Sequence, residues 1–161
     1  MDRAAFAAQQ WHAQYPDLET GPMTLLGRLS EAAQVIARDH LNPVFAEHGL
    51  QPGEFDVLAT LRRSGPPYQL SPTALYEAAM ISSGSMTNRL DRLQKAGLIE
   101  RLPNPADGRG SLVGLSAAGL ALIEPALLAH VRNQQALVAG LQQEEQQQLS
   151  ELLHKLLASL G

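Results

Sequence analysis

Small polar side chains gather in one short stretch of the chain, residues 82–97. Ser83, Thr87 and Asn88 carry hydroxyl and amide groups, which both donate and accept hydrogen bonds. Such groups match the donor and acceptor pattern on the edges of nucleic-acid bases. Arg92 follows Asn88 by four residues, and a guanidinium suits a phosphate oxygen. The stretch could therefore bind a nucleic acid; the alternative is an ordinary solvent-exposed helix surface.

An apolar stripe in the same stretch predicts that it is a helix. Met86, Leu90 and Leu93 recur at i, i+4 and i+7, the spacing of one helix face turned toward a core. Ser82 can cap the first turn, and Gly97 stands where a left-handed residue commonly ends a helix. The polar side chains then lie away from the core.

The flanking segments place this helix in a winged helix-turn-helix. A short helix capped by Ser71 ends about three residues before it, which is the spacing of a helix-turn-helix. After it, residues 98–102 and 111–115 read as two strands around a turn-rich loop, a hairpin or wing. Arg109 at the tip suits a narrow minor groove, or is a plain solvated arginine. The residues that we expect to contact double-stranded DNA are Ser82, Ser83, Ser85, Thr87, Asn88, Arg92 and Arg109.

Arg89 lies on the border of the apolar stripe. At about 100° per residue it is roughly 65° from the centre of the stripe, so it points inward or sideways. Asp56 lies beside Phe55 in an otherwise apolar helical segment, residues 53–63. A partly buried carboxylate requires a cation, and an Asp56–Arg89 pair would satisfy both groups. The pair is either a purely structural ion pair or part of a ligand site.

Two further side chains have alternative roles. Arg101 lies on the first strand of the wing, where an arginine contacts phosphate or is simply solvated. Trp11 is the only tryptophan, in a terminal helix with polar neighbours. It is either a core anchor or a surface on which a ligand stacks.

Long helical patterns precede and follow the winged lobe. Residues 3–15 and 23–47 form the first pair, with a kink expected at Pro43, and the leucine-rich helix that begins at residue 142 or 143 ends the chain. These helices are more apolar than a small lobe can bury, so we expect a two-fold homodimer. The predicted fold is mainly α with a small β-hairpin wing. Its expected parts are N-terminal helices (1–50), a DNA-binding lobe (51–115) and C-terminal dimerisation helices (116–161).

Composition excludes several classes of protein. The 161 residues carry a formal charge of −4 and no cysteine, which excludes disulfides and thiolate metal sites. The segment 82–115 is nevertheless +2, which fits one limited DNA-binding surface on an acidic body. No metal-binding histidine spacing, nucleophile elbow or phosphate loop is present, so we expect no enzyme, metal or cofactor. Without a signal peptide or membrane span, we expect a cytoplasmic protein.

The chain resembles the MarR family of bacterial transcription regulators over about residues 23–160. The segments that carry the resemblance are GEFDVLATL (53–61), SSGSMTNRLDRLQKAGLIER (82–101), PNPADGRG (103–110) and LSAAG (115–119). The wing of this family usually has Asp-Arg-Arg, whereas this chain has Asp107, Gly108 and Arg109. The resemblance implies a homodimer that binds a palindromic operator with two helices about 34–36 Å apart.

The N-terminal segment WHAQYPDLETGPMTLLGRLS (11–30), with SSGSMTNRL (82–90), is similar to the urate-responsive, PecS-like branch. That resemblance implies a ligand set of Trp11, Asp56, Arg89 and Arg101. It also implies an anionic purine such as urate, bound between the DNA-binding lobe and the dimerisation helices, that releases a repressor from DNA. Two alternatives stay open: a response to another aromatic or carboxylic anion, or a helical dimerisation adaptor that binds no DNA.

Overall fold

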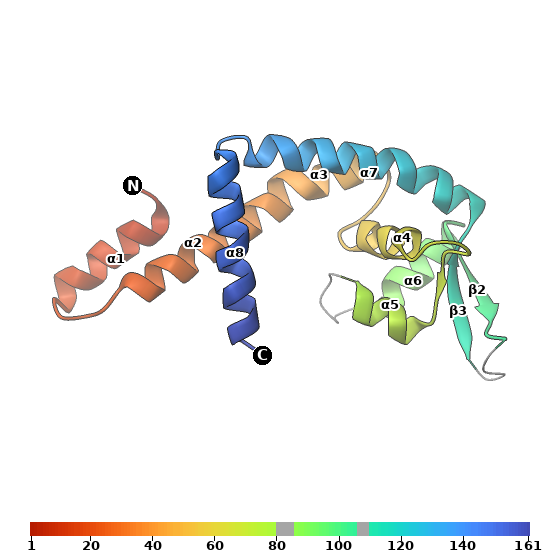
Figure 1. The fold of residues 1–161 in the computed structure, drawn as a ribbon, viewed down its shortest axis with the longest axis horizontal. Coiled ribbons are helices and arrows are strands. Elements are labelled where there is room, and N and C mark those ends of the chain that lie inside the picture. The colour runs from red at the N-terminus through yellow and green to blue at the C-terminus, as the bar shows by residue number, and fades with distance from the viewer. Residues whose placement is uncertain (80–85, 106–109) are drawn as a thin grey trace. The chain divides into compact units, whose positions relative to one another are not determined.

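The computed structural model describes residues 1–79, 86–105 and 110–161. The chain divides into two compact units, Met1–Pro43 and Val44–Gly161, and each is described by itself (Figure 1). Helices dominate both units, and one small antiparallel sheet lies in the second. The mainly α fold with a small wing is therefore confirmed, while the three-part division at residues 50 and 115 stays a prediction. None of the described helices is long and apolar enough to cross a membrane.

The first unit contains two helices, α1 (Arg3–Gln14) and α2 (Gly21–Val35). Asp2 caps α1, because its side chain accepts a hydrogen bond from the backbone nitrogen of Ala5 at 2.8 Å. At the junction with the second unit, α2 continues into a π-helix, η1 (Ile36–Leu41), and then into α3 (Asn42–Glu47). The irregularity expected at Pro43 thus takes the form of a widened turn just before the proline, which lacks a backbone donor.

Three helices build the lobe of the second unit that the sequence predicts to bind DNA: α4 (Glu54–Arg63), α5 (Pro72–Ala78) and α6 (Met86–Lys95). Ser71 caps α5 as expected, accepting from the backbone nitrogen of Ala74 at 3.1 Å. Gly97 ends α6 with a φ of 72°, which confirms its predicted left-handed conformation. The segment between α5 and α6, with the predicted Ser82 cap, lies outside the described residues.

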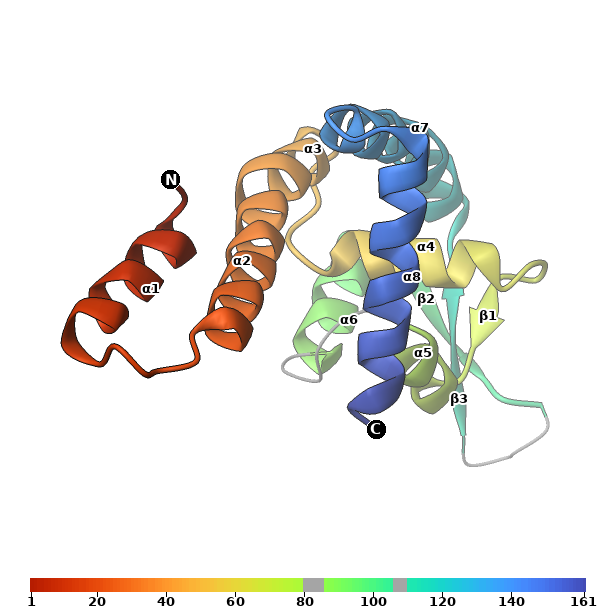
Figure 2. The ribbon, with the colours of Figure 1, turned by 60° about the vertical axis from the view of Figure 1, so that its left-hand side comes forward.

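The sheet has the strand order β1-β3-β2, with β1 at Gln69–Leu70, β2 at Ile99–Pro103 and β3 at Ser111–Leu115. All pairings are antiparallel, and Arg101 of β2 stands opposite Val113 of β3. The two strands of the wing are confirmed. The two-residue β1 was not expected, because so short a segment shows no period of alternation. Figure 2 shows α4 and the sheet together in this unit.

The core of the lobe contains one face of each of these elements. Leu90 and Leu93 of α6 are buried, whereas Met86 is half-buried, so the predicted apolar stripe is largely confirmed. The largest side chains that are less than 2% exposed are Val57, Leu58, Thr60, Leu61, Leu75, Leu93, Ile99, Val113 and Ile123. Each buried leucine of this kind contributes about 1.5–3 kcal/mol, so the orientation of α6 is set by its apolar face.

The chain ends with α7 (Ala117–Val138) and α8 (Gln143–Ser159). Ser116 caps α7, and Gln142 forms a reciprocal capping box with Glu145 at the start of α8. Much of the apolar stripe of α8 is exposed in the single chain, with Leu152 at 65% and Leu157 at 69% exposure. A row of exposed leucines on one helix is typical of an interface between subunits.

Candidate functional site

The outer face of α6 carries the described part of the predicted DNA-binding set. Thr87 and Asn88 are exposed, whereas Leu90 and Leu93 of the same helix are buried. The hydroxyl of Thr87 and the amide of Asn88 are thus accessible to a partner of the protein. The remaining predicted DNA contacts lie outside the described residues: Ser82, Ser83, Ser85 and Arg109.

Arg92 is also on α6, but it is tied to α4. Its Nε lies 3.1 Å from Oε1 of Glu54, whose side chain is only 5% exposed, while the side chain of Arg92 is 50% exposed. The sequence predicted a phosphate contact for Arg92 and did not anticipate this partner. The structure therefore pairs Arg92, which was predicted to contact a phosphate, with a buried carboxylate through its Nε.

Arg101 is exposed on β2, and its Nη2 lies 2.5 Å from Oδ1 of Asp91 on α6. Neither alternative from the sequence, a phosphate contact or a solvated side chain, included this ion pair. The pair links the first strand of the wing to the helix before it. Because both side chains are about half exposed, water and salt screen the pair and its contribution to stability is small.

The guanidinium of Arg89 lies against Gly53, the residue before α4. A β-carbon at Gly53 would lie 2.5 Å from Nε of Arg89, and Gly53 has a φ of 82°. Arg89 is half-buried, which confirms the predicted inward orientation. Its Nη1 is buried and has no hydrogen-bond partner among the described residues. A buried donor without an acceptor costs about 1–3 kcal/mol, so this atom is a candidate ligand contact.

Asp56 is half-buried on the first turn of α4. Burial raises the pKa of its carboxyl group, and the nearby charges of His130, Arg63 and Arg89 oppose that rise. The ion pair predicted between Asp56 and Arg89 is wrong, because the ion pairs of the described residues do not include it. Arg89 instead lies against Gly53. Burial therefore outweighs the charge of Arg89 in its effect on the pKa of Asp56.

His130 of α7 completes this cluster, and the sequence reasoning missed it. Its ring lies 4.7 Å from the ring of Phe55 and 5.3 Å from that of Phe45, centroid to centroid. Burial lowers the pKa of His130, while the charge of Asp56 opposes this. The Nδ1 atom is buried without a partner in the described part of the chain. The spacing of His130 from the buried Ile123 and Ala126 on α7 was the signal that could have found it.

Trp11 lies in the first unit, whereas Asp56, Arg89 and Arg101 lie in the second. The indole is 43% exposed, and its ring lies 5.9 Å from that of Tyr15. The structure thus brings Asp56 and Arg89 into one neighbourhood around α4. It pairs Arg101 with Asp91, and the contribution of Trp11 to a shared ligand site remains a prediction.

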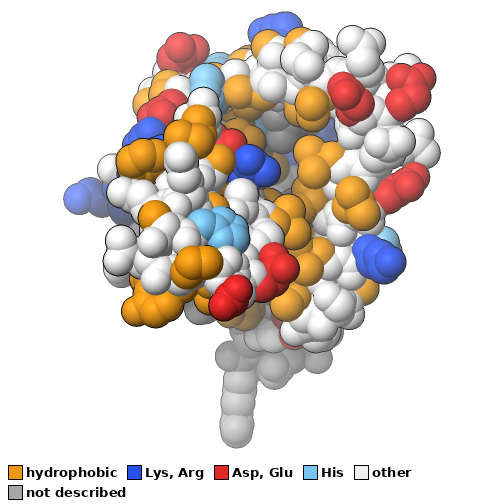
Figure 3. Space-filling model, turned by 90° about the vertical axis from the view of Figure 1, so that its left-hand side faces the viewer, with side chains coloured by type: hydrophobic (Ala, Val, Ile, Leu, Met, Phe, Trp, Pro, Cys, Tyr) orange, Lys and Arg blue, Asp and Glu red, His pale blue; other side chains and the backbone are white. Residues whose placement is uncertain are grey.

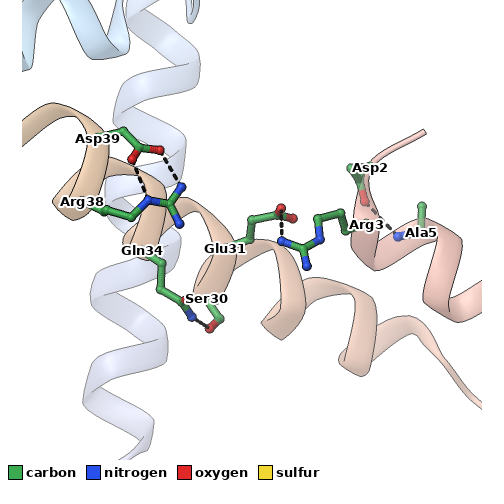
Figure 4. Close-up of polar contacts among 8 residues, drawn as sticks. All are labelled: Asp2, Arg3, Ala5, Ser30, Glu31, Gln34, Arg38 and Asp39. Atoms are coloured by element: carbon green, nitrogen blue, oxygen red, sulfur yellow. Dashed lines mark hydrogen bonds and ion pairs between the residues drawn. The ribbon is translucent and has the colours of Figure 1, made fainter.

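A separate cavity of about 510 Å³ lies in the first unit, lined from α1, α2 and η1. The space-filling view of Figure 3 shows hydrophobic side chains among charged ones at the surface. Of the residues that line the cavity, Arg3 pairs with Glu31 at 3.6 Å, and Arg38 pairs with its neighbour Asp39 at 2.6 Å (Figure 4). No predicted site residue lines this cavity, and both arginines already have carboxylate partners. Among the described residues, no group of three histidines or acids could hold a metal ion.

Comparison with known sequences identifies relatives that match most of the chain. A family model described as MarR family matches residues 48–110, which include α4, α5, α6 and β2. The transcriptional regulator PecS of Dickeya dadantii is 41% identical over 145 residues, which cover 90% of this chain and 87% of PecS. The regulator MhqR of Bacillus subtilis is 30% identical over 79% of this chain and 85% of its own length.

Solved structures with the same fold include two complexes with DNA. The first is a mutant MarR from Escherichia coli with operator DNA, which is 32% identical with a TM-score of 0.73 and covers 91% of this chain and 97% of that one. The second is Sco3205 of Streptomyces coelicolor with DNA, 26% identical with a TM-score of 0.77, covering 90% and 91% of the two chains. The winged helix-turn-helix described above is therefore the fold of these DNA-bound proteins.

Proposed function

The chain belongs to the MarR family of DNA-binding transcriptional regulators, and from this membership we propose that it is a homodimeric repressor released from its operator by a small anionic purine. It is a regulator and not an enzyme. The proposed site of action is the cytoplasm, and the proposed ligand is urate or a related oxidised purine. Three groups of observations support the three parts of this proposal.

The exposed polar face of α6 supports DNA recognition. Thr87 and Asn88 point away from the core and match the hydrogen-bonding edges of bases in a major groove. The relatives described as bound to DNA share this lobe. In a two-fold dimer, two copies of α6 would enter successive major grooves of a palindromic operator.

The exposed apolar side chains of the outer helices support the homodimer. On α8, Leu149, Leu152 and Leu157 are 48%, 65% and 69% exposed in the single chain. On α2, Leu25 and Leu26 are 62% and 54% exposed. A second copy of the same chain is the simplest partner that would cover such faces, because closed two-fold dimers are the commonest oligomers.

The unpaired polar atoms around Asp56 carry the proposal of an anionic ligand. Nη1 of Arg89 and Nδ1 of His130 are buried without partners among the described residues, and both residues act electrostatically on the carboxyl group of Asp56. A flat purine anion has carbonyl oxygens that can accept from the guanidinium of Arg89 and ring N–H groups that can donate to a carboxylate. Trp11 and Arg101 would complete the set by stacking and by charge, as the resemblance to the urate-responsive branch implies.

Release of DNA would follow from the position of Arg89 on α6. A ligand that attracts Arg89 acts directly on the helix that presents Thr87 and Asn88. The ligand shifts the equilibrium only if it binds the DNA-free conformation more tightly than the DNA-bound one. The helix would then leave the register that the operator requires.

A gel-shift experiment with DNA from upstream of the protein's own gene tests the proposal. Binding that weakens steeply with salt is expected, since phosphate contacts release counterions. Urate should dissociate the complex at lower concentrations than xanthine, salicylate or citrate. A response to salicylate or citrate alone would reassign the ligand to another class of anion. Absence of binding to any palindromic duplex would favour the dimerisation adaptor.

A further inference from the structure

Glu54 is a buried acid at the start of α4 that the DNA-binding and ligand sites do not explain. The residue is 3% exposed, although glutamate is almost never buried without a partner. It lies between Gly53, which contacts Arg89, and the apolar core of α4. A carboxylate in this position must be held by more than one donor, because burial of an unpaired charge strongly destabilises the fold.

The two oxygens of Glu54 have separate partners. Oε2 accepts a hydrogen bond from the backbone nitrogen of Gln51 at 2.7 Å, and the backbone nitrogen of Glu54 donates to the Gln51 carbonyl at 3.0 Å. This reciprocal pair fixes the side chain. Oε1 lies 3.1 Å from Nε of Arg92 on α6. A fixed carboxylate therefore holds the arginine by the nitrogen nearest its aliphatic stem.

The rest of the Arg92 guanidinium is available on the face of α6 that is proposed to meet DNA. Arg92 follows the exposed Asn88 by four residues, so the two side chains share one face of the helix. Half of the Arg92 side chain is exposed, whereas its partner Glu54 is buried. A guanidinium has five N–H donors in a rigid fork, and the Nε edge can face one carboxylate while the terminal nitrogens face a phosphate.

We propose that Glu54 is a positioning residue for operator binding: it holds Arg92 by Nε and so presents the terminal nitrogens of that arginine to a phosphate of the DNA backbone. The inference rests on the DNA binding of the family and not on the identity of the ligand. It adds a buried residue of α4 to the residues that determine operator affinity. Its physical basis is preorganisation, since ordering a long side chain in advance removes part of the entropy cost of binding.

The decisive experiment compares operator affinity in Glu54→Gln, Arg92→Gln and the double variant, at several salt concentrations. Glu54→Gln should weaken binding by about 5- to 100-fold per dimer, because two arginines lose their preordering. It removes a negative charge near DNA, which by itself would tighten binding, so a loss points to positioning. Arg92→Gln should weaken binding and reduce the salt slope by about two per dimer. Adding Glu54→Gln to Arg92→Gln should then change nothing.

Unchanged or tighter binding by Glu54→Gln would overturn the proposal, and tighter binding would mean that Glu54 competes with the phosphate for Arg92. An equal loss in the Arg92→Gln background would also overturn it, because the effect would then be general damage to the lobe. Arg92→Lys keeps the charge but lacks the Nε edge, and it should lose affinity with an unchanged salt slope. This variant keeps the proposal testable if Glu54→Gln fails to fold.

The chain offers a matched control at the other end of α4. Arg62 pairs with Glu124 of α7 at 2.5 Å, so Glu124→Gln removes the charge from another ion pair of α4, one in which neither partner belongs to α6. Operator affinity of Glu124→Gln should stay within about twofold of the wild type. A loss comparable to that of Glu54→Gln would show that any ion pair of α4 supports DNA binding, and would contradict a specific role for Glu54.

Discussion

The guanidinium of Arg89 lies so close to Gly53 that a β-carbon on Gly53 would stand 2.5 Å from its Nε and 2.8 Å from its Cζ. Gly53 precedes α4, and Arg89 lies on α6, the proposed recognition helix. The absence of a side chain at one position therefore determines where an arginine of the other helix can lie. This contact adjoins Asp56, three residues further along the chain, and connects the proposed ligand site to the proposed DNA-binding surface.

Gly53→Ala should displace Arg89. Both a left-handed backbone (φ 82°) and the close contact oppose the new methyl group. The backbone costs about 1–2 kcal/mol, and forcing a side chain aside adds about 1–3 kcal/mol. We expect a loss in the free energy of unfolding, measured by chemical denaturation, together with a weakened response of operator binding to urate.

Gly49→Ala is the control for this substitution. Gly49 has a similar φ of 72°, but a β-carbon there would meet nothing within 4 Å. The Gly49→Ala variant should lose only the free energy of unfolding that the left-handed backbone costs. Its operator binding should keep the full response to urate. If the two alanine variants behave alike, the contact with Arg89 is unimportant.

Arg89→Ala should separate ligand sensing from DNA binding. Because Arg89 points inward and Thr87 and Asn88 point outward, operator affinity should change by less than about threefold, while the fold-effect of urate shrinks about tenfold, within the usual range of coupling energies. Fluorescence anisotropy with labelled operator, with and without urate, measures both quantities. Arg63→Ala, which removes another charge near Asp56, should leave the urate response intact. The reverse pattern, lost affinity with an intact response, would make Arg89 a phosphate contact.

Asp56→Asn should stabilise the ligand-free protein at neutral pH. Burial raises the pKa of Asp56, so the folded state holds a proton more readily than the unfolded state. The resulting stability is present at low pH and is lost as the pH rises through the folded-state pKa. The asparagine variant avoids that loss, and its advantage in the free energy of unfolding should shrink as the pH falls. An advantage that grows toward low pH would contradict the raised pKa.

His130→Phe should have the opposite pH dependence. Burial lowers the pKa of His130, so stability is present above its ordinary pKa and is lost as the pH falls through the folded-state pKa. A phenylalanine beside Phe45 and Phe55 cannot take up a proton, so the variant should gain stability over the wild type below about pH 6.5. Thermal unfolding between pH 5 and pH 8 measures this. If the stabilities of the two proteins change in parallel with pH, His130 is not the source of the stability lost at low pH.

Leu157→Glu should weaken the homodimer. The side chain is 69% exposed in the single chain, and a charge in an apolar interface would have to be desolvated on association. Sedimentation equilibrium should show dissociation at protein concentrations where Gln148→Glu, a polar substitution on the same helix, stays dimeric. A monomeric wild type would contradict the homodimer, and an unaffected Leu157→Glu would place the dimer contact elsewhere.

Local features of the fold followed closely from the sequence. Ser71 caps the helix that it was predicted to cap, and Gly97 is left-handed as predicted, because each depends on neighbours within one turn. The burial of Leu90 and Leu93 followed from the helical period. The hairpin strands were also predicted, because turn residues marked both of their ends.

Relationships between elements could not be predicted in the same way. Helical spacing predicted the inward orientation of Arg89 but could not predict its partner. Arg89 was expected to contact Asp56, and it contacts Gly53 instead. Glu54 reads as an ordinary charged residue in the sequence, and only the packing of α4 on α6 reveals its pairing with Arg92. His130 was missed because one histidine in a long helix shows nothing of the rings from other segments that surround it.

The most direct test of a shared ligand and DNA equilibrium is the affinity of urate for the protein with and without bound operator. Thermodynamic linkage requires that urate and operator weaken each other by the same factor. We predict that urate binds the free dimer more tightly than the operator complex, by the factor with which urate reduces operator affinity. Equal urate affinity in the two states, measured by calorimetry under matched salt, would contradict a ligand that acts through Arg89 on the recognition helix.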